Sequence, residues 1–221
     1  MPRESAGARA ERARQIVEQL QRVYPNAHCE LDYTNPLELL IATILSAQCT
    51  DKRVNIVTKE LFRVCKTAAD YVALPQEQLE EIIRTTGFFR AKAKNIKACC
   101  ADLVGKHGGE VPKTMDELHA LAGVGRKTAN VVLGNAFDIN VGVVVDTHVQ
   151  RLSTRLGLTK ETDPVKIEQD LAKILPQDRW IRFSHQIILH GRALCVARSP
   201  KCAECDLNSL CYAKDKTAGP K

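Results

Sequence analysis

Apolar residues recur every three to four positions along most of the chain, which is the spacing of an amphipathic helix. In residues 8–24 they form one stripe that ends at Pro25, and a second stripe from Asp51 onward carries Val54, Val57 and Leu61. The same spacing predicts helices over residues 37–47, 68–73, 76–86, 90–106, 115–121, 126–137, 147–156, 164–175 and 179–194. The pattern therefore predicts an all-α protein.

Start and stop signals agree with these ranges. Residues 35–38 (NPLE) combine an N-cap, a first-turn proline and a capping-box acid, and residues 114–117 (TMDE) repeat the capping box. Gly87 and Gly108 follow predicted helices, where glycine commonly ends a helix. Residues 141–145 (VGVVV) are the one run with strand character. Because this run has no partner strand, we expect a buried extended connector.

Composition and length narrow the class of protein. The chain has 221 residues, of which 44% are hydrophobic and 26% charged, as in ordinary globular proteins. No apolar run approaches the roughly 20 residues that span a bilayer, and the polar start, residues 1–14, predicts no secretory signal. The net charge of +6 is mild support for a polyanionic partner. Residues 84–101 carry five basic residues and no acidic one, a pattern that fits either a DNA-contacting or a merely solvated helix face.

Four of the nine cysteines are crowded near the C-terminus. Cys195, Cys202, Cys205 and Cys211 have the spacing C-x6-C-x2-C-x5-C, which allows four thiolates to surround one centre. Zinc and a [4Fe-4S] cluster both accept four cysteines, so the ligand set fits either. An odd number of cysteines without a secretory signal is unlike a disulfide framework. We therefore expect a metal or cluster site here, with the other five cysteines acting as small apolar residues.

A glycine-rich turn joins two of the predicted helices. Residues 118–129 (LHALAGVGRKTA) have the form of a helix-hairpin-helix, in which Gly123 and Gly125 let the backbone approach a ligand closely. The helix that begins at Arg126 offers unpaired amides and a positive dipole end to a phosphate oxygen. The simpler interpretation of this segment is an ordinary helical hairpin. The more specific interpretation is a hairpin that contacts the DNA backbone.

Asp146 follows the apolar run and precedes a predicted helix. It is expected to cap that helix, and amides at a helix start also keep a carboxylate ionised. An ionised, partly buried carboxylate suits electrostatic catalysis, so capping and catalysis are compatible for this residue.

Taken together, these motifs resemble the endonuclease III family of DNA glycosylases. The matching stretches are residues 45–51, 121–131, 145–149, 190–192 and the four cysteines, and the resemblance covers nearly the whole chain. It implies a two-lobed helical fold. One lobe, residues 29–140, would be a six-helix barrel containing the helix-hairpin-helix, and the other, residues 1–28 and 141–221, would hold a [4Fe-4S] cluster.

The resemblance also implies a mechanism. Lys127 matches the family's nucleophile, which displaces a damaged base at C1′, forms a Schiff base and cleaves the strand on the 3′ side by β-elimination. Asp146 matches the catalytic carboxylate. A lone lysine in a first helical turn is usually only a surface residue. The functional interpretation of Lys127 therefore depends on its position beside the hairpin.

Further residues are implied to contact DNA. Gln48 matches the residue that fills the gap left by a flipped nucleotide, and Phe88 stands where the family has an apolar wedge. Gln48 is equally readable as a solvated polar residue, and Phe88 as a core aromatic. The hairpin is expected to bind phosphate through Gly123, Gly125, Arg126 and Thr128, and the electrostatic footprint is expected to include Arg90, Lys92, Lys94, Arg198 and Lys201.

The expected partner is double-stranded DNA with damaged pyrimidines or abasic sites. We expect a monomeric, cytoplasmic protein associated with a bacterial nucleoid, without a membrane anchor. Two alternatives remain: a monofunctional glycosylase, and a non-catalytic helix-hairpin-helix module with a structural metal. Neither needs Lys127 as a nucleophile.

Overall fold

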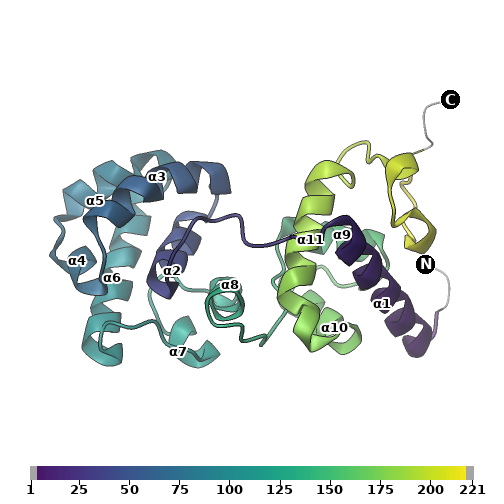
Figure 1. The fold of residues 1–221 in the computed structure, drawn as a ribbon, viewed down its shortest axis with the longest axis horizontal. Coiled ribbons are helices and arrows are strands. Elements are labelled where there is room, and N and C mark those ends of the chain that lie inside the picture. Colours follow the sequence, from purple (N-terminus) through teal and green to yellow (C-terminus); the bar gives the residue numbers. More distant parts are fainter. Residues whose placement is uncertain (1–3, 218–221) are drawn as a thin grey trace. The chain divides into compact units, whose positions relative to one another are not determined.

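The structure is a computed structural model that describes residues 4–217. It divides into two compact units: a middle unit, Cys29–Val141, and a terminal unit, Met1–His28 with Gly142–Lys221 (Figure 1). The predicted lobe of residues 1–28 and 141–221 thus includes positions 1–3 and 218–221, which lie outside the described residues. All regular structure in the described part is helical, which confirms the predicted fold class.

Seven α-helices build the middle unit. Helix α2 is its most apolar element, with Leu39, Leu40 and Ile41 fully buried. It packs against α3, α6 and α8, while α4 and α5 pack along α6. The bounds are α2 Pro36–Leu45, α3 Asp51–Val64, α4 Ala68–Ala73, α5 Gln76–Ile83, the 3-10 turn η1 Arg84–Thr86, α6 Phe89–His107, α7 Met115–His119 and α8 Arg126–Ala136.

The terminal unit joins the N-terminal helix to the last third of the chain. Its core includes Ile16, Leu20, Leu152, Leu171 and Phe183, which come from four different helices. The bounds are α1 Ala6–Val23, α9 Thr147–Arg155, α10 Pro164–Ile174, η2 Gln177–Arg179, α11 Trp180–Ala193, η3 Cys202–Glu204 and η4 Asn208–Leu210.

One buried cation ties the two ends of the terminal unit together. Arg12 of α1 donates to the carbonyls of Leu156 and Leu210 at 2.6 and 3.0 Å, and pairs with Glu4 at 2.8 Å. Its guanidinium also lies 4.0 Å from the centre of the Tyr212 ring. Helix α1 is thereby fastened to the segment that carries the last cysteines.

The predicted start and stop signals largely hold. Asn35 caps α2 by accepting from the amide of Glu38 at 2.9 Å, but the carboxylate of Glu38 reaches past the N-cap to the amide of Thr34 at 2.7 Å. The expected capping box is therefore shifted by one residue. Residues 141–145 form neither a helix nor a strand, and Val143 and Val145 pack into the core of the terminal unit.

One predicted helix is divided into an α-helix and a 3-10 turn: residues 76–86 form α5 followed by η1. The helix predicted over residues 179–194 is present as α11, and the short 3-10 turn η2 precedes it. No helix among residues 4–217 combines the length and apolarity needed to cross a membrane.

Candidate active site and DNA-contacting residues

The hairpin between α7 and α8 depends on Gly123. Its φ of +76° is in the left-handed region, and a Cβ built there would lie 2.9 Å from the Cβ of Asn95 on α6. Both the backbone conformation and the packing therefore require glycine. Gly125 has an ordinary φ of −86°, and a Cβ on it would meet nothing within 4 Å.

Helix α8 begins with exposed basic residues. Among the described residues, no side chain caps its N-terminus, and its first turn carries Arg126 and Lys127 with no acidic residue. Arg126 and Lys127 are exposed and Thr128 is half-buried. Amides at a helix start together with positive side chains form an anion-binding surface.

Asp146 caps α9 as predicted. Its Oδ1 accepts from the amides of His148 and Val149 at 2.9 and 2.8 Å, and its Oδ2 lies 3.1 Å from His148 Nδ1. The side chain of Asp146 is largely buried. Three nitrogens therefore fix the orientation of this carboxylate and satisfy much of its hydrogen-bonding capacity. The sequence analysis did not predict the contact with His148, although a histidine two residues after an N-cap aspartate is close enough to reach it.

Gln48 and Phe88 share an unusual backbone conformation. Their φ values are 54° and 49°, and both belong to the left-handed region that non-glycine residues rarely occupy. Gln48 is exposed in the loop between α2 and α3, and Phe88, directly before α6, is 68% exposed. Phe88 is therefore not a core aromatic. Strained backbone under exposed side chains is typical of functional positions.

The basic residues around Phe88 differ in their roles. Arg90 is exposed, and its guanidinium lies 5.5 Å from the centre of the Phe89 ring; Arg84 lies 5.8 Å from the same ring. Lys92, which we predicted to contact DNA, is only 5% exposed. Its placement on α6 directs the side chain inward, so the prediction of a phosphate contact is wrong.

The Lys92 ammonium instead binds backbone carbonyls. Nζ donates to Leu45 O at 2.8 Å and to Thr86 O at 2.7 Å. Burial lowers the pKa of this lysine below its ordinary value. The basic residues of the segment 84–101 therefore differ in exposure: Arg90 is exposed, whereas Lys92 is buried.

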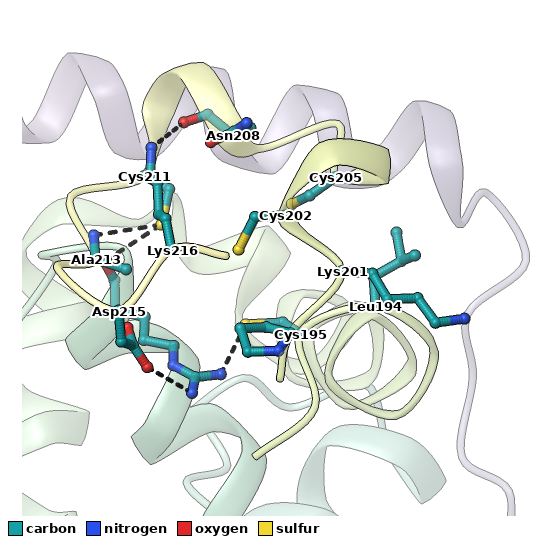
Figure 2. Close-up of a pocket in the computed structure, with 12 residues that line it drawn as sticks. Leu194, Cys195, Lys201, Cys202, Cys205, Asn208, Cys211, Ala213, Asp215 and Lys216 are labelled. Atoms are coloured by element: carbon teal, nitrogen blue, oxygen red, sulfur yellow. Dashed lines mark hydrogen bonds and ion pairs between the residues drawn. The ribbon is translucent and has the colours of Figure 1, made fainter. Parts of the chain in front are cut away.

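The four C-terminal cysteines line one pocket in the terminal unit (Figure 2). The pocket has about 340 Å³ of empty space, part of it open to solvent. Within residues 4–217, no three His, Cys, Asp or Glu side chains converge closely enough to hold a single metal ion. Four cysteine thiols that line one pocket are a donor set suited to a metal or cluster.

Hydrogen-bond donors surround the cysteine sulfurs. His190 Nε2 lies 3.3 Å from Cys205 Sγ, and Tyr24 Oη lies 3.2 Å from the other ring nitrogen of His190. Arg155 donates to Cys195 Sγ at 3.4 Å. Burial raises the pKa of the Cys205 thiol to about 11, so a bound cation is needed to keep this sulfur as a thiolate. These contacts were not predicted: Arg155 lies 40 residues before Cys195 in the sequence, and His190 belongs to the matching stretch 190–192 but was given no contact with a cysteine.

The loop between Cys195 and Cys202 is held in a fixed shape. Arg155 donates to the carbonyls of Val196 and Ala197 at 2.8 and 3.0 Å. Arg198 and Lys201 are exposed on this loop, and Ser199 between them has a φ of 52°. The loop therefore presents two cations from a rigid base.

The two predicted catalytic residues belong to different units. Lys127 lies in the middle unit on α8, and Asp146 lies in the terminal unit at the start of α9.

Comparisons with known proteins give one consistent result. A family model described as "HhH-GPD superfamily base excision DNA repair protein" matches residues 41–177. An endonuclease III from Synechocystis sp. is 55% identical over 204 residues, covering 92% of this chain and 93% of the relative.

Solved structures agree with the sequence relatives. A non-covalent endonuclease III–DNA complex has a TM-score of 0.87 and 48% identity, covering 91% of this chain and 94% of its own. A trapped endonuclease III–DNA covalent intermediate has the same TM-score and identity, covering 91% of this chain and 95% of its own.

Proposed function

Because this chain belongs to the HhH-GPD superfamily of base excision DNA repair proteins, we propose that Lys127 and Asp146 carry out its chemistry. The resemblance to endonuclease III is confirmed, and the chain is a base-excision repair enzyme, a DNA glycosylase and abasic-site lyase that acts on double-stranded DNA. Oxidised pyrimidines are the proposed lesions, and the bacterial nucleoid is the proposed site of action.

Lys127 is the proposed nucleophile. Its neutral amine attacks C1′ of the damaged nucleotide, the glycosidic bond breaks, and the base leaves with that electron pair and a proton. Opening of the sugar ring then gives a Schiff base between Nζ and C1′. The Lys127 side chain is exposed on α8, so a bound nucleotide can reach its amine.

Asp146 is the proposed electrostatic and proton-transfer partner. Its carboxylate stabilises positive charge on the sugar as the base departs and helps to move protons to and from the amine. In the lyase step a proton leaves C2′, the C3′–O bond breaks and the 3′ phosphate departs. Water then hydrolyses the imine and releases the lysine. The cap contacts of Asp146 support this role, because a carboxylate held by two amides needs little reorganisation during the reaction.

DNA binding is proposed to use three features. The hairpin residues Gly123, Gly125, Arg126 and Thr128 bind a phosphate at the start of α8. Arg90, Arg198 and Lys201 supply sequence-independent attraction to the backbone. Gln48 fills the space left by the flipped nucleotide, and Phe88 enters the stack as a wedge.

Cys195, Cys202, Cys205 and Cys211 are proposed to hold a [4Fe-4S] cluster. A cluster held by these four cysteines would further stiffen the loop that carries Arg198 and Lys201. A brown protein with iron and labile sulfide after anaerobic purification is the expected result. A colourless protein with zinc would contradict the proposal.

The observation that carries the catalytic proposal is Lys127 on the first turn of a helix whose start is suited to a phosphate. The test is borohydride trapping on a duplex with one thymine glycol. We expect an adduct with the wild type and with Lys106→Ala, which removes another exposed lysine of the middle unit, and none with Lys127→Ala.

Other outcomes would redirect the assignment. Base release without an adduct would indicate a monofunctional glycosylase. Neither release nor adduct from iron-loaded protein, on several oxidised pyrimidines and on abasic sites, would leave a DNA-binding scaffold.

A further inference from the structure

Lys92 has no role in the chemistry proposed above, yet it is a buried cation. Burying an ammonium is unfavourable unless its donors are used, and an apolar residue would fill the same space without that cost. Its two contacts are with Leu45 and Thr86, two residues that lie far apart in the sequence. The role of Lys92 should therefore follow from the two segments that its contacts connect.

Both carbonyls are at the ends of helices. Leu45 is the last residue of α2, and Thr86 is the last residue of η1. Carbonyls at helix C-termini lack an internal partner and carry partial negative charge, so a cation stabilises them. A single ammonium with three donors satisfies both ends at once.

Each of these helix ends is followed within three residues by a non-glycine residue in the left-handed conformation. Gln48 follows Leu45 by three positions, and Phe88 follows Thr86 by two. Lys92 lies one turn into α6, and its side chain points back toward the helix start, where Nζ reaches Thr86 O. It thus joins the base of the Gln48 loop to the base of the Phe88 turn, all within the middle unit.

We propose that Lys92 is a positioning residue that holds the Gln48 loop and the Phe88 turn in the mutual register needed for both side chains to enter the duplex together. This inference rests on the roles proposed for Gln48 and Phe88. Lys92 makes no contact with DNA in this scheme. Its loss would let the two loops move independently, and misplacement of contact groups by about 1 Å can cost 10²-fold in rate.

Lys97 offers a matched control on the same helix. Its Nζ also donates to backbone carbonyls, those of Tyr71, Val72 and Leu74, but these are at the end of α4. Lys92→Met and Lys97→Met therefore remove the same kind of contact from one helix, and only the first affects the two loops.

The test compares two substrates under single-turnover conditions. Excision from a duplex with one thymine glycol requires the loops, whereas cleavage at an abasic site in a single strand does not. We expect Lys92→Met to slow the duplex reaction by about 10- to 100-fold and the single-strand reaction far less. Lys97→Met should change neither, and Lys92→Arg, which keeps charged donors, should restore part of the loss. An equal loss on both substrates, or the same loss with Lys97→Met, would overturn the inference.

Reference variants separate this inference from the function on which it rests. If Gln48→Ala and Phe88→Ala both slow duplex excision but Lys92→Met does not, the inference alone fails. If neither reference variant slows excision, the proposed roles of these side chains fail and the inference fails with them. In the double variant Lys92→Met/Phe88→Ala, losses that are smaller than additive would support action through Phe88.

Hydrogen exchange gives a readout that does not depend on activity. Lys92→Met should accelerate exchange in residues 46–50 and 86–89, and Lys97→Met should accelerate it only near the end of α4. Should Lys92→Met fail to fold, Lys92→Gln, whose shorter amide keeps a donor, takes its place in both measurements. Unchanged exchange in residues 46–50 and 86–89 would contradict the proposed positioning role.

Discussion

Asp146 and Asp163 each cap a helix of the terminal unit through two backbone amides, although Asp146 also contacts His148, and the pair allows capping to be separated from catalysis. Each Oδ1 accepts from the amides two and three residues ahead, at 2.9 and 2.8 Å for Asp146 and at 3.1 and 3.0 Å for Asp163. Asparagine caps a helix about as well as aspartate, whereas alanine loses about 0.5–2 kcal/mol. We therefore expect Asp146→Asn to unfold with nearly the wild-type free energy, and both alanine variants to lose about 1 kcal/mol.

Catalysis should respond differently at the two positions. Removing one preorganised group that stabilises transition-state charge costs about 10²–10³ in rate. Asp146→Asn should accordingly lose at least about 100-fold in strand cleavage while keeping its fold. Asp163→Asn, which has the same cap geometry on α10, should cleave at the wild-type rate.

The assay combines urea unfolding with single-turnover cleavage of a duplex with one abasic site. Cleavage by Asp146→Asn within about threefold of wild type would refute the argument that its negative charge is needed. An Asp146→Ala variant as stable as wild type would refute the capping argument. A slow Asp163→Asn variant would show that the loss of cleavage is not specific to the carboxylate of Asp146, since asparagine keeps the cap at both positions.

Two further predictions concern stability. Gly123→Ala should lower the free energy of unfolding by about 2–4 kcal/mol, because left-handed strain adds to a clash with Asn95. Gly108→Ala, at φ +63° in open space, should lower it by only about 1–2 kcal/mol. Urea unfolding measures both losses, and equal losses would contradict the clash. Arg12 holds the pKa of Glu4 below its usual value in the folded protein. The pair therefore stabilises the fold at pH values above the pKa of Glu4 in the unfolded chain. That stabilisation is lost as the pH falls through the lower pKa of Glu4 in the folded protein. Between about pH 5 and 3 the wild type should therefore lose more stability than Glu4→Gln, and parallel pH profiles would contradict this.

The helices and their starts could be read from the sequence because the signals are local. Thr114 accepts from the amide of Glu117, and Asp163 from the amides of α10, within three residues in each case. The cysteine motif is equally local, since four thiols within a short segment need no tertiary information to suggest a shared centre. The shift at Glu38, from Asn35 to Thr34, shows that even a local motif leaves a choice among neighbouring amides.

The candidate site was only partly predictable. The residue types at 127, 146 and 123 and the four cysteines were identified from motifs and family resemblance. What remained hidden were contacts across long sequence separations, such as His190 beside Cys205 and Asn95 against Gly123.

The amino-acid sequence by itself determined the helical periods, the caps, the glycine turn and the cysteine spacing, because these depend on groups within about one turn of each other. Only the tertiary structure decided which lysine of α6 faces solvent and which is buried. Lys92 and Lys94 look alike in sequence, yet Lys92 binds the ends of α2 and η1 while Lys94 is exposed. The physical reason is that the environment of a long cation is set by the helices packed around it, and its own helix supplies only the direction in which it points.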